Sequence, residues 1–369
     1  MRIDRLSSES SSACTNRTHR FRQGLEFNVE ALERYFAEQL SDFTPPIQVT
    51  QFPGGQSNPT YRLDTPNATY VLRRKPPGNL VPSAHAIERE YRVIDALFKV
   101  SEFPVARPLL LCEDTAVIGT AFYIVQFVDG RILWEPALPD LPREGRKPIY
   151  DAMVSTLADL HALDYRAIGL TDFGRPEGYL ARQVIRWSKH YTDDADKAGR
   201  ISALERLIEW LPKNAPVTTA PPTIVHGDYR LDNLMFHRDQ PRVVAVLDWE
   251  LSTIGDPIAD FAYHLMVYRM ASGGVRGLDG VDLRALAIPS EQEYVAAYCA
   301  RRGLDGIPDL TYYLAFCMFR LAAICHGIAG RLHRGTAVSP EAAKYAAQAE
   351  PLAELAWRTA SAHHSIHSN

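Results

Sequence analysis

The sequence has few cysteines, and none of them stands in a pattern that would bind a metal. Its five cysteines are scattered over 369 residues, without a CxxC pair or ligand-like spacing to a histidine. A structural zinc site needs closely spaced Cys and His ligands, so the sequence argues against one. An odd number of scattered thiols is typical of reduced cysteines in a protein core, and we therefore expect a reducing, cytoplasmic compartment.

Long hydrophobic runs and an excess of charge are also lacking. No stretch of 18 apolar residues is present, which predicts no membrane span. The first twenty residues lack the apolar stretch of a secretory signal, and we expect a disordered polar lead over residues 1–26. The formal net charge of −4 gives no reason to expect nucleic acid or an acidic membrane surface as a partner. No feature of the sequence indicates an oligomeric state.

What is present fits a protein of two lobes. The composition, 46% hydrophobic, allows a large core, but 369 residues are too many for a single compact one. Short β-like segments and two helical patterns come before Asp129-Gly130, the expected crossing point, and predict a first lobe with an antiparallel sheet over residues 27–128. The expected helices are 29–40 and 83–100, and the expected strands are 47–52, 60–63, 69–73 and a strand pair within 117–127.

Helical patterns dominate the remainder and predict a second lobe over residues 129–358, followed by a tail at 359–369. Two short apolar runs bounded by polar turns, 223–225 and 243–247, are typical of buried strands. The Gly-rich stretch 271–290 is expected to be a surface loop or a lid. The expected helices of this lobe are 149–163, 179–191, 201–211, 260–270, 291–301 and 312–332.

The strongest chemical signal is the segment HGDYRLDN at residues 226–233, followed fifteen residues after Asn233 by Asp248. Phosphoryl transfer needs an attacking hydroxyl held in line and neutralisation of the charge on the phosphoryl oxygens. A carboxylate that accepts the hydroxyl proton, together with oxygen ligands for Mg²⁺, meets these needs. Asp228, Asn233 and Asp248 supply such groups on a loop and at the end of the following strand. We expect His226 to brace this loop and not to carry a proton.

This spacing resembles the signature of the aminoglycoside phosphotransferase and choline kinase-like superfamily, in which HGDxxxxN precedes a strand that ends in Asp. The resemblance implies an α+β, protein kinase-like two-lobed fold, with a sheet-bearing N-lobe and a mostly helical C-lobe. It also implies that Asp228 is the catalytic base and that Asn233 and Asp248 bind magnesium. HGDYRLDNLMF and LDWELSTIGDPIADFAYHL further resemble the kinase-like domain fused to acyl-CoA dehydrogenases of the family member 10 and 11 type, and its bacterial 4-hydroxyacyl-CoA kinase relatives.

The same resemblance suggests how ATP would be held. Arg73, at the end of a strand, matches the cation that holds the ATP phosphates, although many relatives have lysine there, and Glu90 matches the helix glutamate that holds this cation. Arg74 and Lys75, which follow Arg73, are expected on a solvated basic face. Glycines between strands let backbone N–H groups approach phosphates. The other expected nucleotide-binding residues are Gly54, Gly55, Ser57 and Asn58, in the turn between the first two expected strands, and Gln126, Phe127 and Val128, at the hinge that meets adenine.

Two segments of the second lobe bear on the acceptor. Arg182, Arg186 and Lys189 share one face of the helix at 179–191, with Trp187 among them, and suit an anionic substrate. A solvated helix face explains these charges equally well. A late helix carries Arg331, which we place near the site. Relatives of this kind are associated with phosphorylation of 4-hydroxyacyl-CoA thioesters, so the resemblance implies an ATP- and Mg²⁺-dependent kinase of a hydroxyacyl-CoA or a hydroxy acid.

Two alternatives stay open. A kinase of an aminoglycoside, another antibiotic or a choline-like alcohol would share the fold and the base, but would be expected to meet its cationic acceptor with an acidic pocket. A non-catalytic nucleotide-binding regulator would share the fold alone. Degenerate kinases usually lose one of the three residues Asp228, Asn233 and Asp248, which are all present here.

Overall fold

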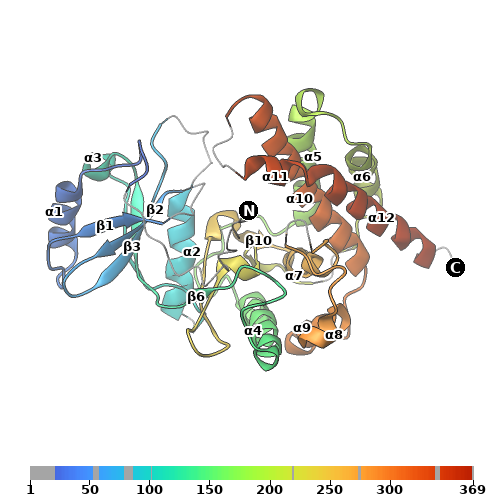
Figure 1. Ribbon diagram of the computed structural model, residues 1–369, viewed down its shortest axis with the longest axis horizontal. Helices are drawn as coiled ribbons and strands as arrows, with labels where there is room; N and C mark the ends of the chain where they lie inside the picture. The colour runs from blue at the N-terminus through green and yellow to red at the C-terminus, as the bar shows by residue number, and fades with distance from the viewer. Residues whose placement is uncertain are drawn as a thin grey trace, which may run out of the picture. The chain divides into compact units, whose positions relative to one another are not determined.

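The computed structural model describes residues 21–52, 58–78, 86–100, 102–217, 220–272, 276–336 and 341–367 (Figure 1). Internal packing divides the chain into two compact units. The first unit comprises Met1–Ile87 and Leu109–Ile132, and the second comprises Glu88–Pro108 and Leu133–Asn369. Of the expected lead over residues 1–26, residues 1–20 lie outside the described residues.

The first unit is built on a five-stranded sheet with the order β1-β2-β3-β5-β4. The pairs β1–β2, β2–β3 and β3–β5 are antiparallel, and Leu72 in β3 lies opposite Tyr61 in β2 and Ile124 in β5. The elements of this unit are α1 (Val29–Gln39), β1 (Gln48–Gln51), β2 (Thr60–Asp64), β3 (Thr69–Arg74), β4 (Pro108–Cys112), α3 (Thr115–Ile118), β5 (Phe122–Gln126) and β6 (Arg131–Ile132).

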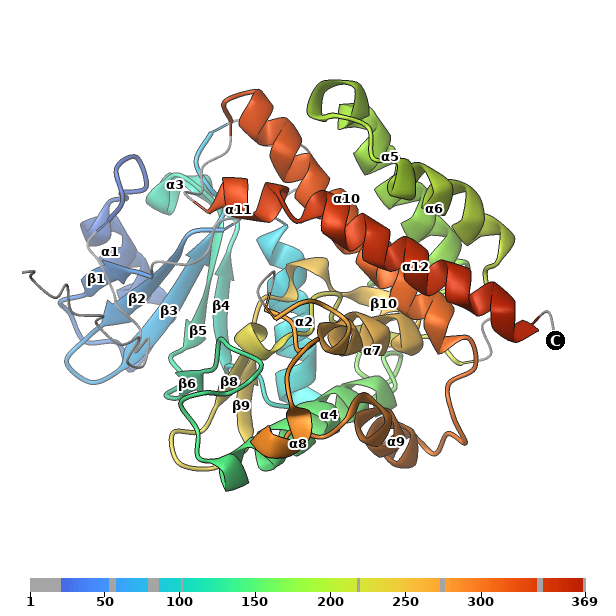
Figure 2. The same cartoon turned by 45° about the vertical axis from the view of Figure 1, so that its right-hand side comes forward.

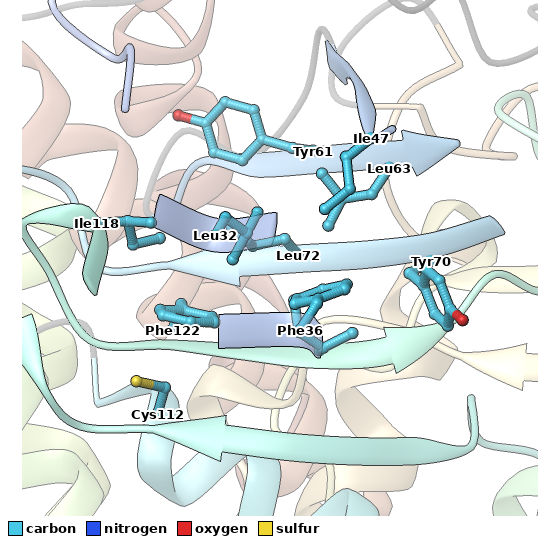
Figure 3. Close-up of a cluster of buried hydrophobic side chains, with 11 residues drawn as sticks. Leu32, Phe36, Ile47, Tyr61, Leu63, Tyr70, Leu72, Cys112, Ile118 and Phe122 are labelled. Carbon is cyan, nitrogen blue, oxygen red and sulfur yellow. The ribbon is translucent and has the colours of Figure 1, made fainter. Parts of the chain in front are cut away.

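One face of this sheet forms the core of the first unit, because side chains alternate between the two faces of each strand. Leu63, Leu72 and Phe122 are fully buried there. Leu32 and Phe36, one helical turn apart on α1, pack onto the same face (Figure 3). The side chain of Asn28 caps α1 by accepting a hydrogen bond from the backbone N–H of Ala31 at 3.0 Å. Burial of each large apolar side chain contributes roughly 1.5–3 kcal/mol, so this face holds the sheet and α1 together.

Alternation also places the two arginines of β3 on opposite faces of the sheet. Arg74 is buried, with 2% of its surface exposed, and not on the solvated face expected for it. Its guanidinium donates to the carbonyl of Ile118 at 3.2 Å and lies 5.3 Å from the ring centre of Phe27. Arg73 is half-buried on the other face, where its Nη1 lies 3.4 Å from the hydroxyl of Thr60.

The strand pair expected within 117–127 was wrong in its first half. The residues before Gly119 form the short helix α3, capped by the side chain of Asp114, and the partner strand is β4, which lies earlier in the chain. Asp114 accepts from the N–H of Ala116, and Gly119, at φ 85°, ends the helix in the left-handed conformation. These capping residues outweigh the β-propensity of the segment.

The second unit is mostly helical, and α10 runs through its centre. α10 packs against α5, α6, α7 and α12, and Figure 2 shows α12 lying along it. The helices of this unit are α2 (Ile87–Val100), α4 (Arg143–Ala162), α5 (Tyr179–Ala198), α6 (Ser202–Lys213), α7 (Pro257–Leu265), α8 (Leu283–Leu286), α9 (Glu291–Arg302), α10 (Leu310–His333), α11 (Ala342–Ala346) and α12 (Ala349–His367), with one-turn helices at Leu231–Asn233, Trp249–Leu251 and Met266–Tyr268.

Among the described residues, α10 is the one helix long and apolar enough to cross a membrane by length and composition. Within the protein, 78% of its apolar window is buried, as in the core helix of a folded domain. The four cysteines that the structure describes are buried and form no disulfide.

The second unit also contains two pairs of short strands. β7 (Thr223–Val225) pairs antiparallel with β10 (Thr253–Gly255), and β8 (Leu234–Phe236) pairs antiparallel with β9 (Val243–Val246). β7 and β9 lie where buried strands were expected, whereas β8 and β10 were not foreseen. Each has three residues, too few to show a period of two.

Two boundaries differ from those expected. All of α2 after Ile87 packs with the second unit, where Arg89 donates to the carbonyl of Phe173 at 2.7 Å and Arg92 pairs with Asp172. The second boundary between the units lies after Ile132 and not after residue 128. At the other end of the chain, α12 continues through the expected tail to His367.

Candidate active site

The segment 226–233 leaves β7 and forms a loop that ends in a single helical turn, Leu231–Asn233. Gly227 has φ 83°, and a Cβ there would lie 2.7 Å from the carbonyl oxygen of Leu251, so the loop requires glycine at this position. The side-chain amide nitrogen of Asn233 donates to the carbonyl of Asp228 at 2.8 Å and to its carboxylate at 3.0 Å. The fold therefore brings the expected base and the first expected metal ligand into contact.

The hairpin of β8 and β9 brings the third residue to the same place. Leu234 opposes Val246 in its register, so the residues just outside this pair, Asn233 and Leu247, are also neighbours. The N–H of Leu247 donates to the carbonyl of Asn233 at 2.8 Å. Asp248 follows at once in the left-handed conformation, at φ 65° and ψ 64°. Such a backbone is costly for a residue other than glycine and is often found at functional sites.

His226 is fully buried and holds both ends of this arrangement. Its Nδ1 accepts from the N–H of Asp228 at 3.2 Å, and its Nε2 lies 2.8 Å from the carbonyl of Leu247. This pattern corresponds to the tautomer protonated on Nε2. Both ring nitrogens are thus engaged with the backbone, as a residue that braces the loop would be.

Asp260, in the first turn of α7, was not foreseen as part of the site. Its carboxylate is buried and accepts from the N–H of His226 at 2.7 Å, from the N–H of Gly227 at 2.8 Å and from Nε2 of His161 at 3.3 Å. Burial alone would raise the pKa of Asp260, but the hydrogen bonds from His161 and from the N–H of Gly227 oppose burial, and the pKa lies below its usual value.

His161 completes this buried network from α4. Burial lowers the pKa of His161 despite the neighbouring carboxylate of Asp260. At neutral pH the imidazole is therefore neutral, with Nε2–H donating to Asp260 and Nδ1 accepting from the hydroxyl of Tyr298 at 2.7 Å. A hydrogen bond, and not an ion pair, joins His161 to Asp260.

Arg320, on α10, holds the carbonyl of Gly227 and was not foreseen as part of the site either. With 6% of its surface exposed, it donates from Nη2 to the carbonyl of Gly227 at 2.6 Å. Its guanidinium carbon lies 4.7 Å from the ring centre of Tyr263. Burial raises the pKa of the Tyr263 hydroxyl, and the nearby carboxylate of Asp228 raises it further. Both peptide groups of Gly227 are therefore fixed, its N–H by Asp260 and its carbonyl by Arg320.

Arg230 places a positive charge within the loop itself. Its Nε lies 3.5 Å from the carboxylate of Asp228, and its Nη2 lies 2.9 Å from that of Asp232. Asp232 also pairs with Arg276 at 3.1 Å, and Arg276 lies over the ring of Trp134. Burial lowers the pKa of Arg230, but the two carboxylates outweigh burial and raise it, so the guanidinium stays charged beside the expected base.

The donors of the loop fit magnesium chemically. Carboxylate and amide oxygens are the hard ligands that Mg²⁺ prefers. Asn233 contacts Asp228, and Asp248 follows Leu247, whose N–H donates to the carbonyl of Asn233. Over the ranges that the structure describes, no group of three or more His, Cys, Asp and Glu side chains is arranged to hold a metal. An octahedral Mg²⁺ usually takes one or two carboxylates and completes its shell with water and phosphate, so a two-residue protein set suffices.

The expected nucleotide residues are distributed over both units. Gly54, Gly55 and Ser57 lie outside the described residues. Asn58 is fully buried just before β2, and Glu90 is buried in α2 of the second unit. Because Arg73 belongs to the first unit, its pairing with Glu90 stays a prediction.

The expected hinge, Gln126 to Val128, begins at the end of β5. Gln126 is exposed there, and the N–H of Phe127 donates to the carbonyl of Thr69 at 3.1 Å. The guanidinium of Arg62 lies 4.7 Å from the centre of the Phe127 ring. Contact of these residues with adenine stays a prediction.

The expected substrate residues on α5 have different surroundings. Arg182 donates to the backbone carbonyls of Glu177 and Arg175, and Lys189 pairs with Asp193 at 2.8 Å. Arg186 lies over the buried ring of Trp187, 5.2 Å from its centre. Arg331 is exposed in the last turn of α10.

A strand-rich unit followed by a helical unit that carries this loop and hairpin defines a protein kinase-like fold. The model of the phosphotransferase enzyme family, APH, matches residues 48–310. Acyl-CoA dehydrogenase family member 10 of Mus musculus is 43% identical over 92% of this chain and 32% of its own length. The chain belongs to this phosphotransferase enzyme family, as its sequence predicted.

Two solved structures extend the comparison. A candidate aminoglycoside phosphotransferase from Ralstonia eutropha has 48% identity and a TM-score of 0.83, covering 91% of this chain and 99% of its own. A thermostable variant of aminoglycoside phosphotransferase APH(4)-Ia, bound to ADP and hygromycin B, has 16% identity and a TM-score of 0.58, over 89% and 98% of the two chains. The second likeness shows the fold alone. The chain spans less than half the length of the curated relatives it matches.

Proposed function

We propose that this phosphotransferase is a Mg²⁺- and ATP-dependent kinase that phosphorylates the hydroxyl group of a hydroxyacyl-CoA or a hydroxy acid. The observation that carries the proposal is the contact of Asn233 with Asp228 in a loop whose glycine is held by Asp260 and Arg320. A carboxylate in a rigid loop, beside oxygen ligands for magnesium, is the arrangement that in-line phosphoryl transfer requires. We expect the cytoplasm as its location.

In this mechanism the hydroxyl oxygen of the acceptor bonds to the γ-phosphorus of ATP, and Asp228 accepts the proton of that hydroxyl. The bond from that phosphorus to the β,γ-bridging oxygen breaks, and ADP leaves. Asn233 and Asp248 would hold Mg²⁺, which would neutralise charge on the phosphates. Arg73, supported by Glu90, would bind the phosphates, while Gly54, Gly55, Ser57 and Asn58 would approach them and Gln126, Phe127 and Val128 would meet adenine.

Two observations support an anionic acceptor, one on this chain and one on its relatives. Arg186 presents a guanidinium with no carboxylate partner among the described residues, which suits a carboxylate or a phosphate. Relatives of 40–43% identity bear the name acyl-CoA dehydrogenase, and the matched part is less than half of each. A kinase that shares a chain with an acyl-CoA enzyme would be expected to act on a related thioester.

A cationic alcohol is the second candidate acceptor. It is favoured by the name of the Ralstonia eutropha protein, a candidate aminoglycoside phosphotransferase with 48% identity to this chain. Kinases of choline-like alcohols are included in this alternative. A nucleotide-binding regulator without turnover is the third possibility, and the contact of Asp228 with Asn233 argues against it.

The test is release of ADP by the purified protein with Mg·ATP. The acceptors to be compared are 4-hydroxyacyl-CoA thioesters, the matching free acids, an aminoglycoside set and choline, with Asp228→Asn as the blank. We expect turnover with the thioesters or acids. Turnover confined to cationic alcohols would overturn the acceptor class, and nucleotide binding without turnover of any acceptor would favour the regulator.

A further inference from the structure

The three basic residues on the α5 face differ in what neutralises them. Lys189 is exposed and forms an ion pair with Asp193 four residues later, at 2.8 Å. The guanidinium of Arg182 donates to two backbone carbonyls, of Glu177 and Arg175, in the segment that precedes its own helix. Neither side chain needs a ligand to satisfy its charge, so both behave as parts of a solvated helix face.

Arg186 has no such partner. Over the part of the chain that the structure describes, its contact is the ring of Trp187, with the guanidinium carbon 5.2 Å from the ring centre. Burial lowers the pKa of Arg186, and the positive charge of Arg320 lowers it further, while the hydroxyl of Tyr179 acts in the opposite direction. Among the described residues no ion pair joins Arg186 to a carboxylate, and its side chain is exposed, so its charge is open to a ligand.

Arg320 adds a second charge at the same ring. Its guanidinium carbon lies 5.3 Å from the centre of Trp187, and its Nε is buried without a hydrogen-bond partner among the described residues. The Trp187 ring, 7% exposed, is held by its own Nε1–H, which donates to Gln183 at 3.1 Å. Two arginines around one rigid indole make a fixed positive site.

The surroundings of this ring add to the positive charge. Burial lowers the pKa of His190, and the charges of Arg331 and Arg186 lower it further, against the opposing influence of Asp194 and Asp193. Both of these aspartates are already paired, Asp194 with Arg334 and Asp193 with Lys189. The charge that remains around Trp187 is therefore positive.

This positive site is connected to the loop of Asp228. Arg320 donates to the carbonyl of Gly227, the residue before Asp228, and lies over Tyr263, whose hydroxyl is close to the Asp228 carboxylate. Arg320 thus contacts both the Trp187 ring, over which Arg186 lies, and the loop of the expected base. An acceptor whose hydroxyl met Asp228 could extend its charged end toward Arg186.

We propose that Arg186, with Arg320 behind it at Trp187, binds the negatively charged group of the acceptor and sets the preference of the kinase for anionic alcohols. This inference rests on the proposed function and assigns the specificity to one of the three basic residues of the α5 face. The group bound is a carboxylate if the acceptor is a hydroxy acid, or a phosphate if it is a CoA thioester.

The experiment measures equilibrium binding by calorimetry with the nucleotide site filled by Mg·ADP, which lacks the γ-phosphoryl group that the reaction transfers. The probes are 4-hydroxypentanoyl-CoA, 4-hydroxypentanoate and the uncharged N-acetylcysteamine thioester of the same acid. Arg186→Gln is compared with Lys189→Gln on the same helix, and Arg186→Lys tests rescue by charge alone. The unfolding midpoint of each variant shows that it is folded.

We expect Arg186→Gln to weaken binding of one anionic probe about 10- to 100-fold, because hydrogen bonds to a charged group are lost. Lys189→Gln should change binding by less than about threefold, since exposed pairs contribute little. Weakening of the CoA probe alone identifies a phosphate as the bound group, and weakening of the free acid identifies a carboxylate.

The inference is overturned if wild-type protein binds no anionic probe more tightly than the uncharged one. It is also overturned if Arg186→Gln behaves like Lys189→Gln, or if it weakens the uncharged probe to the same degree. The proposed function fails separately, when wild-type protein binds the anionic probes but releases no ADP with Mg·ATP.

Discussion

Replacement of Asp260 by asparagine should uncouple the loop of Asp228 from the core of the second unit. The carboxylate accepts three hydrogen bonds, two of them from consecutive backbone N–H groups. An asparagine can accept with one oxygen only, and its amide N–H groups would face a remaining backbone donor. Leaving buried donors unsatisfied in this way should cost about 2–4 kcal/mol of unfolding free energy.

The pH dependence of stability provides a second signature. Because the pKa of Asp260 is held below its unfolded value, its contribution to stability is fully present above the unfolded pKa of about 3.9 and is lost as pH falls through the folded pKa. Asp260→Asn has no carboxyl group to titrate at this position. Its unfolding free energy should therefore fall less steeply than that of wild type as pH is lowered below this value.

Urea unfolding at neutral and acidic pH measures both effects. Asp193→Asn is the matched control, because Asp193 is exposed and its ion pair among the described residues is with the exposed Lys189. The reasoning would be refuted if Asp260→Asn unfolded within about 0.5 kcal/mol of wild type at neutral pH, the range usual for surface substitutions. An unchanged pH slope would refute the part assigned to the carboxyl group.

Three further substitutions test Gly227, Arg74 and Arg73. Gly227→Ala should lose most ADP-release activity, since its Cβ would lie 2.7 Å from the carbonyl of Leu251 at a φ of 83°; wild-type rates would contradict this. Arg74→Met should lower the unfolding free energy by roughly 1–3 kcal/mol, because the carbonyl of Ile118 loses its buried donor. Arg73→Met should instead raise the KM for ATP with little change in urea unfolding, and the reverse pattern in these two variants would show that their roles are exchanged.

The three residues of the loop and hairpin could be predicted because their spacing is local. Residues 226–233 form one continuous loop, and the hairpin of β8 and β9 after it returns the chain to Asp248 beside the end of this loop. The roles of Asp260 and Arg320 depend on how α7 and α10 pack against the loop, which no short-range pattern encodes. The available signal for both residues was a charged side chain within an otherwise apolar helical pattern.

Other differences had signals in the sequence. Tyr70, Leu72 and Arg74 stand at every second position of β3, and this period of two places Arg74 on the buried face of Tyr70 and Leu72. Asp193 follows Lys189 by four residues, the spacing of a helical ion pair. By contrast, the extension of α12 through the expected tail follows from burial of Thr359 and Ala360 in the second unit, and that burial is a tertiary effect.

The most direct test of the central claim is detection of the phosphorylated acceptor by mass spectrometry after incubation with Mg·ATP. Wild-type protein and the control Asp193→Asn should convert a 4-hydroxyacyl-CoA or its free acid to the phosphate ester, with an equal amount of ADP. Asp228→Asn should form neither product above the protein-free background, because it lacks the carboxylate that accepts the hydroxyl proton. Full conversion by Asp228→Asn would contradict the assignment of this residue as the base.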